Sequence, residues 1–235
     1  MKHLIFGILF SCAAALTAAT PAAQYDFDDS TGLPDTALKG KGKVEYVDGV
    51  KGKAIKMSDN TLTIPCPEGM TAEEGTIAMW IKPVNWDSSR EEFVFFLNNQ
   101  NQEKDGRMIL YKYRNPNGLG LTFWYGNPDD AKKKAVSAWP KADYQQGEWI
   151  FYAVTWSKKS GLTGLFFNGK RYTGSRCAAD IFYQKFGDFI LNAPPFRPAN
   201  REMETAYDLI RFYPEALSSG EIEKLYTEDV KSIQK

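Results

Sequence analysis

Paired carboxylates are the first residues of this sequence that could do chemistry. A retaining glycosidase mechanism needs two carboxyl groups about 5 to 5.5 Å apart, and alternate residues of a strand share one face and can reach that spacing. Glu202 and Glu204 share a face if their segment is extended, whereas the neighbours Glu73 and Glu74 point to opposite faces. Polar residues on a strand edge are the simpler interpretation of Glu202 and Glu204. The sequence therefore favours a protein without a catalytic centre and keeps a glycoside hydrolase as the alternative.

A tyrosine with basic neighbours is the second candidate for catalysis. Arg107, Tyr111 and Tyr113 share a face of an expected strand by parity, and a polysaccharide lyase could use a tyrosine beside a basic group. Strands of extracellular proteins are commonly rich in Tyr, Arg and Lys. Lyase chemistry is therefore the weaker of the two enzymatic alternatives.

Histidine is confined to one position, His3. It lies in MKHLIFGILFSCAAALTAATPAA, where a positive start, an apolar run and a stretch of small residues are typical of a secretory signal. The mature chain would then contain no histidine. That excludes Ser-His-Asp and Cys-His nucleophiles and histidine-ligated zinc, copper or iron centres. Any chemistry would depend on carboxylates, tyrosine, lysine or a bound hard cation.

The N-terminal segment also sets the expected location and domain organisation. We expect residues 1–23 to be a signal peptide and residues 24–235 to form a single domain that is secreted, periplasmic or at the cell surface. The run ending at Cys12 is similar to a lipoprotein box, but cleavage among the later small residues is favoured over lipidation. No later segment approaches the about 20 apolar residues of a membrane span.

Charge and cysteine content limit the partners and the cross-links. The chain has 29 basic and 29 acidic residues, and acidic residues interrupt its lysine-rich stretches, so no nucleic-acid partner is expected. Cys66 and Cys177 remain after the signal and are a candidate disulfide, because export makes oxidation feasible. Two buried free thiols are the alternative.

Short apolar runs separated by Gly, Pro, Asn and Asp predict an all-β fold, an antiparallel β-sandwich. Asn168-Gly169 is the strongest hairpin signal, because a type I′ turn needs positive φ at both central residues. Only the end is helical: Ser218 to Glu221 form a capping box and Ile222 and Leu225 follow at helical spacing, so a short C-terminal helix should lie on the sandwich. The expected strands are 25–27, 54–57, 61–64, 76–82, 92–98, 108–113, 119–125, 149–156, 164–168, 170–173 and 205–213.

Three ordered motifs carry a family resemblance. The stretch EGTIAMWIKP at 74–83, the stretch from GEW at 147 through NGK at 168–170, and the stretch AYDLIRFY at 206–213 followed by ALS and EI resemble the laminin-G-like, concanavalin A-like jelly-roll superfamily. The resemblance covers almost all of the chain after residue 23 and implies a jelly roll. The fold hosts lectins, adhesion modules, glycoside hydrolases and polysaccharide lyases, so function must be argued from the site.

The resemblance also implies a structural calcium ion. In calcium-bearing relatives, an aspartate before an arginine-containing last strand meets a ligand from the N-terminal strand. Asp208 matches that position, and Asp26 or Asp28 would supply the second group. The family often has a second aspartate where this chain has Leu209. The alternative is that Asp208 pairs with Arg211 or with a backbone amide.

Aromatic residues make up 14% of the chain and supply the candidate sugar-binding groups. Flat rings pack on sugar rings, and rings on loops are better candidates than rings at the centre of a strand. We expect carbohydrate contacts from Trp124, Tyr125, Trp139 and Trp86, although the last follows the Lys-Pro pair of a framework motif and could be structural.

The run 149–156 is apolar on both parities, which indicates a strand covered on both faces. Its two tryptophans are therefore interpreted as scaffold.

These observations predict a secreted, non-catalytic carbohydrate-binding or adhesion module of the concanavalin A-like lectin type, with a polysaccharide or another glycan as partner. A glycoside hydrolase or polysaccharide lyase acting on extracellular polysaccharide is the first alternative. A structural module with a protein partner at the cell surface is the second.

Overall fold

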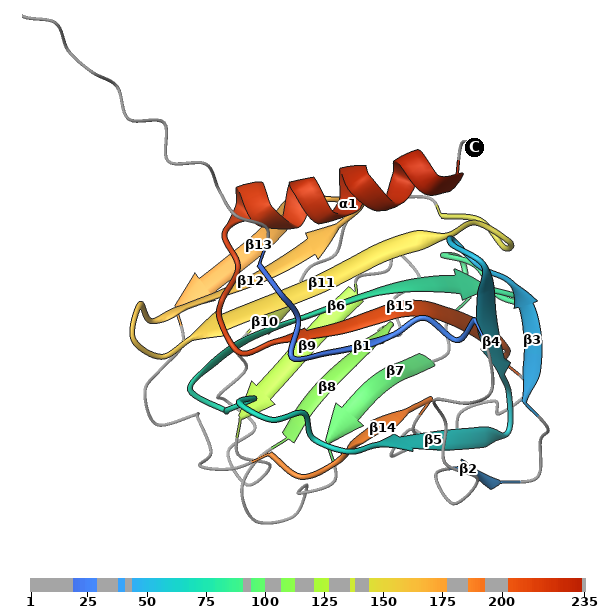
Figure 1. The fold of residues 1–235 in the computed structure, drawn as a ribbon, viewed down its shortest axis with the longest axis horizontal. Helices are drawn as coiled ribbons and strands as arrows, with labels where there is room; N and C mark the ends of the chain where they lie inside the picture. The colour runs from blue at the N-terminus through green and yellow to red at the C-terminus, as the bar shows by residue number, and fades with distance from the viewer. Residues whose placement is uncertain are drawn as a thin grey trace, which may run out of the picture.

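The strands of this chain form two stacked antiparallel sheets with one helix on the outside (Figure 1). The computed structural model describes residues 19–28, 38–40, 44–90, 94–99, 107–112, 121–126, 136–137, 144–176, 186–192 and 203–233. Within these residues every strand pairing is antiparallel, and the predicted sandwich is confirmed.

The first sheet has eight strands in the described residues, in the order β13-β12-β11-β6-β15-β4-β3, with β1 also paired to β15. Its members are β1 (Ala23–Tyr25), β3 (Glu45–Asp48), β4 (Lys53–Met57), β6 (Glu74–Pro83), β11 (Ile150–Ser157), β12 (Leu162–Phe167), β13 (Lys170–Arg176) and β15 (Thr205–Tyr213).

The second sheet has seven strands in the same described part, in the order β10-β9-β8-β7-β14-β5-β2. Its members are β2 (Leu38–Gly40), β5 (Asn60–Ile64), β7 (Val94–Asn99), β8 (Arg107–Lys112), β9 (Leu121–Gly126), β10 (Val136–Ser137) and β14 (Phe189–Leu191). All eleven expected strands have a counterpart in the two sheets. The four strands that sequence reasoning missed, β2, β3, β10 and β14, are too short to show a clear alternation of polar and apolar residues.

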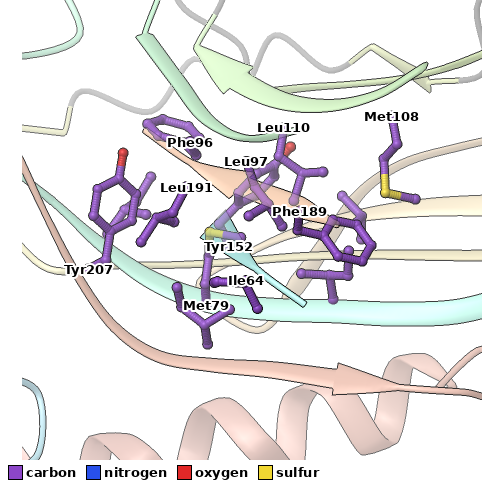
Figure 2. Close-up of a cluster of buried hydrophobic side chains, with 14 of the residues drawn as sticks. Ile64, Met79, Phe96, Leu97, Met108, Leu110, Tyr152, Phe189, Leu191 and Tyr207 are labelled. Atoms are coloured by element: carbon purple, nitrogen blue, oxygen red, sulfur yellow. The ribbon is translucent and has the colours of Figure 1, made fainter. Parts of the chain in front are cut away.

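The main core lies between the two sheets and is filled by alternate residues of their strands (Figure 2). Met79 of β6 and Tyr152 of β11 come from one sheet, while Leu97 of β7, Leu110 of β8 and Phe189 of β14 come from the other. Each of these side chains is buried. The period of two along a strand explains why one half of each strand faces this layer.

The helix α1 (Ser219–Ile233) covers the outer face of the eight-stranded sheet (Figure 1). Its capping box is confirmed, because the Ser218 backbone N–H donates to Glu221 at 2.7 Å and the Glu221 N–H donates to the Ser218 hydroxyl at 3.3 Å. Tyr226 stacks on Trp80 of β6 with ring centroids 5.8 Å apart. The central strands of this sheet are therefore buried on both faces. No helix in the described part of the chain is long and apolar enough to cross a membrane.

The hairpin between β12 and β13 also meets the helix. Asn168 and Gly169 have φ of 48° and 75°, so the predicted positive-φ turn is confirmed. A Cβ on Gly169 would lie 2.7 Å from Cδ1 of Tyr226. Glycine is thus required here by the turn and by the close approach of α1.

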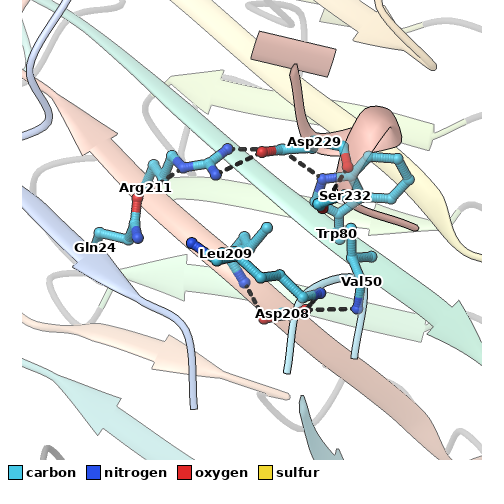
Figure 3. A network of polar contacts seen from close by, with 9 residues as sticks. Gln24, Val50, Trp80, Asp208, Leu209, Arg211, Asp229 and Ser232 are labelled. Carbon is cyan, nitrogen blue, oxygen red and sulfur yellow. Dashed lines mark hydrogen bonds and ion pairs between the residues drawn. The ribbon is translucent and has the colours of Figure 1, made fainter. Parts of the chain in front are cut away.

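A buried ion pair joins the helix to the last strand (Figure 3). Arg211 of β15 and Asp229 of α1 form two parallel bonds of 2.8 Å, and the Trp80 indole N–H donates to the same carboxylate at 2.8 Å. Gln24 of β1 accepts from the Arg211 Nε at 2.9 Å. Four elements thus meet at one fully partnered charge pair.

We expect Asp229→Ala to lower the free energy of unfolding by about 3 to 5 kcal/mol, because Arg211 would stay buried without its partner. The matched control is Lys224→Ala, which breaks an exposed pair on the same helix with Glu228 at 4.0 Å. That variant should change stability by less than about 0.5 kcal/mol. Urea unfolding measures both values, and equal effects would contradict the role given to Asp229.

Candidate functional site

Trp86 was a candidate sugar-binding residue, and the structure shows that this was wrong. The side chain is 1% exposed, and its indole N–H donates to the Glu204 carbonyl at 2.9 Å. The ring stacks on Phe96 and meets the edge of Tyr144. An indole enclosed in this way offers no face to a ligand, so Trp86 belongs to the core that closes one end of the sandwich.

Trp124 and Tyr125 lie on β9, whose backbone register is described. Trp124 pairs with Ile109 and Tyr125 pairs with Met108. Directly paired residues share a face of a sheet, so position 124 belongs to the face of Ile109, away from the main core, while position 125 belongs to the core face. The side chains of β9 and the whole of Trp139 fall outside the described residues, and their contacts with a sugar stay a prediction.

We call the side of the seven-stranded sheet that faces away from the main core the outer face. Phe95, Ile109, Tyr111 and Ile190 form an apolar cluster there. The rings of Phe95 and Tyr111 are 5.2 Å apart. Tyr111 was one of the two tyrosines of the lyase alternative, and the structure packs it among apolar side chains. The side chain of Arg107 is not described, and Tyr113, the other tyrosine, lies outside the described residues.

One polar group interrupts this apolar face. The register places Asn98 of β7 between Ile190 of β14 and Ile109 of β8. Asn98 is buried, and its side-chain oxygen accepts no hydrogen bond from any described residue. A buried acceptor without a donor is costly, and such a group is typical of a place where a water or a ligand hydroxyl donates. Sequence reasoning missed it because an asparagine at the end of a strand usually indicates a turn.

The calcium candidates converge on the turn between β3 and β4. Asp208 of β15 is buried, and its Oδ2 accepts the backbone N–H of Val50 at 2.7 Å and that of Lys51 at 3.2 Å (Figure 3). Its Oδ1 accepts the N–H of Leu209 at 2.7 Å, where a β-bulge holds Leu209 at a φ of 46°. Asp28 accepts the N–H of Lys53 at 2.7 Å from the other side of the turn.

Burial is the main cause that raises the pKa of Asp208 to about 7, and the three backbone donors oppose this rise. The nearby charge of Asp28 adds to it. Close packing also enforces glycine in the turn, since a Cβ on Gly49 would lie 2.6 Å from the Asp208 Oδ2.

The described residues fit a calcium ion poorly. A carboxylate has about four acceptor positions, and backbone N–H groups occupy three of those on Asp208. Asp26 is exposed and bends back toward the Asp28 N–H at 3.5 Å instead of joining the other two. Within the described ranges, no three His, Cys, Asp or Glu side chains gather that could hold a metal. The contacts support the backbone-amide alternative for Asp208. The calcium ion implied by the family resemblance stays a prediction.

The remaining candidate residues are only partly placed. Glu204 lies 3.5 Å from the Lys56 ammonium, so it takes part in a surface ion pair, and Glu202 is outside the described residues. Cys66 is half-buried beside the Pro67 carbonyl. Cys177 is outside the described residues, so the disulfide stays a prediction.

Trp149 precedes β11 and Trp156 lies within it, and the surroundings of the two rings differ. Trp156 is buried and donates to the Thr71 carbonyl at 3.2 Å, which confirms its scaffold role. Trp149 is only partly buried, and the Lys82 ammonium lies 4.6 Å from its ring centroid. The scaffold interpretation of Trp149 was thus incomplete. Strand parity holds a partial signal for this contact. Lys82 shares a face with Trp80, and Trp149 has the parity of Phe151, which packs in the same cluster as Trp80.

We expect Asp208→Asn to lower the free energy of unfolding by about 2 kcal/mol, because an amide N–H₂ group would face backbone donors. Addition of calcium or of EDTA should leave the melting temperature of the unmodified protein unchanged. Differential scanning calorimetry measures both effects. A calcium-dependent rise in melting temperature that Asp208→Asn abolishes would show that the site does bind the metal.

Similarity to known proteins agrees with this architecture. Domain 4 of AbnA, a GH43 extracellular arabinanase from Geobacillus stearothermophilus, was solved in complex with arabinotriose; the match has a TM-score of 0.66 and 16% identity and covers 89% of this chain and all of that one. A structure of botulinum neurotoxin type C, whose cell entry depends on interaction with two ganglioside molecules, matches with a TM-score of 0.62 and 15% identity over 82% of this chain and 46% of the toxin chain.

The binding domain of Paraclostridial Mosquitocidal Protein 1 matches with a TM-score of 0.58 and 16% identity, over 81% of this chain and 47% of that one. At these identities the likeness shows the fold alone. The comparison with curated proteins finds no match. The family model described as the concanavalin A-like lectin/glucanase superfamily matches residues 56–223, which is more than half of the sequence. The chain belongs to the concanavalin A-like lectin/glucanase superfamily.

Proposed function

We propose that this chain is a non-catalytic carbohydrate-binding module that is exported after removal of residues 1–23. The observation that carries the proposal is the extent of the match to domain 4 of the arabinanase, which is covered over its whole length. That domain was solved with arabinotriose bound. A chain that reproduces a complete sugar-associated domain is best explained as a binding module of the same kind.

The outer face of the seven-stranded sheet is the surface that we propose for the sugar. The eight-stranded sheet has its own outer face largely covered by α1. On the outer face of the seven-stranded sheet, Tyr111 is partly exposed, and the register places position 124 beside Ile109. That face combines an apolar cluster with the unsatisfied oxygen of Asn98, which is buried and would be reached through a bridging water. Aromatic and aliphatic groups suit the C–H faces of a sugar ring, and an amide oxygen suits a hydroxyl.

We expect the protein to bind an arabinan or another extracellular polysaccharide, and Trp124→Ala to weaken binding at least about tenfold, or about 1.4 kcal/mol. Position 124 is on the outer face by register, next to Ile109. The control is Tyr46→Ala, which removes an exposed ring from the other sheet. Isothermal titration calorimetry with arabino-oligosaccharides, xylo-oligosaccharides and cello-oligosaccharides measures the affinities.

Two outcomes would count against the proposal. Absence of binding to every glycan offered would remove the carbohydrate-binding function. Release of new reducing ends or of unsaturated products during prolonged incubation would show an enzyme, and the glycoside hydrolase or lyase alternative would replace the module.

A further inference from the structure

A second group of surface residues lies on the eight-stranded sheet, on the side opposite to the proposed sugar surface. Lys56 of β4 pairs with Ala206 of β15, which pairs with Lys82 of β6. The two lysines are therefore separated by one strand, about 10 Å, with a buried alanine between them. Trp149 follows in the same row, because Ile150 pairs with Ile81. We call Lys82, Trp149 and the neighbouring Asp48 the Lys82 corner.

Unlike its lysine neighbours, Lys82 makes no direct ion pair with a carboxylate of the described residues, although the nearby charge of Asp48 acts to raise its pKa. Lys56 pairs with Glu45 at 2.6 Å, and Lys53 pairs with Asp48 at 2.8 Å. Lys82 forms no ion pair with any described carboxylate; its contacts are the Trp149 ring at 4.6 Å and the Asp48 carbonyl at 3.5 Å. Partial burial lowers the pKa of Lys82. A half-buried cation held over an indole is thus left with donors to spare.

Trp149 adds an apolar wall and another donor. Its ring is partly buried and packs against the cluster under α1. No described acceptor takes its indole N–H. The Asp48 carboxylate, which is 93% exposed, stands beside this group with acceptor positions that its bond to Lys53 does not use. Donors, an acceptor and an aromatic edge therefore lie together around one ammonium, which feels the nearby charge of Asp48 but forms no direct ion pair with a described carboxylate.

This combination selects for a ligand that carries both a carboxylate and hydroxyl groups. A carboxylate would satisfy the Lys82 ammonium with a charge-assisted hydrogen bond, and adjacent hydroxyls could accept from the indole N–H and donate to Asp48. A neutral sugar lacks the charge, and an acidic peptide lacks the ring hydroxyls. We infer that the Lys82 corner binds a uronic acid residue of an acidic polysaccharide, at a site separate from the outer face of the seven-stranded sheet.

The direct test is titration of the full-length mature protein with oligogalacturonate, followed by calorimetry. Lys82→Met keeps the alkyl stem over Trp149 but removes the charge, and it should weaken binding at least tenfold. Trp149→Phe removes the N–H and should weaken binding several-fold. Higher salt should weaken the binding of the unmodified protein, because the contact is partly exposed.

Lys158→Met is the matched control. Lys158 follows the other end of β11, about 30 Å from Trp149 along that strand, and pairs with Glu73 at 2.8 Å. The Lys158→Met variant removes the same charge as Lys82→Met and should leave the affinity for oligogalacturonate unchanged. Melting temperatures within one or two degrees of the unmodified protein would confirm that each variant is folded.

Three results would overturn the inference: equal losses in Lys82→Met and Lys158→Met, no binding of oligogalacturonate by the unmodified protein, or equally tight, Lys82-dependent binding of poly-glutamate, which would assign the corner to an acidic peptide. Trp124→Ala separates this inference from the proposed function. It should weaken neutral-sugar binding at least about tenfold and leave oligogalacturonate binding intact.

Discussion

The structure depends on one constraint: the central strands of the eight-stranded sheet are apolar on both faces and must be covered twice. Strand β11 is buried at every position from Ile150 to Ser157. The seven-stranded sheet covers one face and α1 covers the other (Figure 1). The Arg211–Asp229 pair fixes the helix in place over the last strand, and Trp80 contributes both a ring for Tyr226 and a donor for Asp229 (Figure 3). Both sides of this sheet are therefore used for stability, which is why we propose the exterior of the other sheet for recognition.

The buried carboxylate of Asp208 also finds its hydrogen-bond partners within the molecule. A buried carboxylate needs compensation, and a bound cation is one source of it. Here the amides of Val50, Lys51 and Leu209 converge on it. The turn between β3 and β4 thus acts as an anion-binding loop for a side chain of the same molecule. A site that resembles a metal centre by sequence position can be occupied in this way by backbone donors.

Much of the fold could be predicted from the sequence, because its strongest signals are local. Asn168-Gly169 specifies a turn through its backbone preferences, and the Ser218 to Glu221 box specifies a helix start through two reciprocal hydrogen bonds. The site was harder to predict. Trp86 follows a strand like a loop residue, and only the packing of Phe96 and Tyr144 around it shows that it is buried.

Asp229 and Lys82 show the same limit. One looks like a solvated helix residue and the other like a strand-end lysine, yet distant partners place the first inside and hold the second over the ring of Trp149. Pairing across long sequence separations decides these roles, and no spacing within a single segment contains that information. Residues that act through non-local contacts are therefore the ones that sequence patterns identify least well.

The central claim is that the protein holds a glycan on the outer face of the seven-stranded sheet without cleaving it. A crystal structure with a bound neutral oligosaccharide tests this claim most directly. The account predicts an intact sugar over strands β7 to β9, with a hydroxyl linked to the buried Asn98 side-chain oxygen through an ordered water. A sugar bound elsewhere, or a cleaved product between two carboxylates, would contradict it.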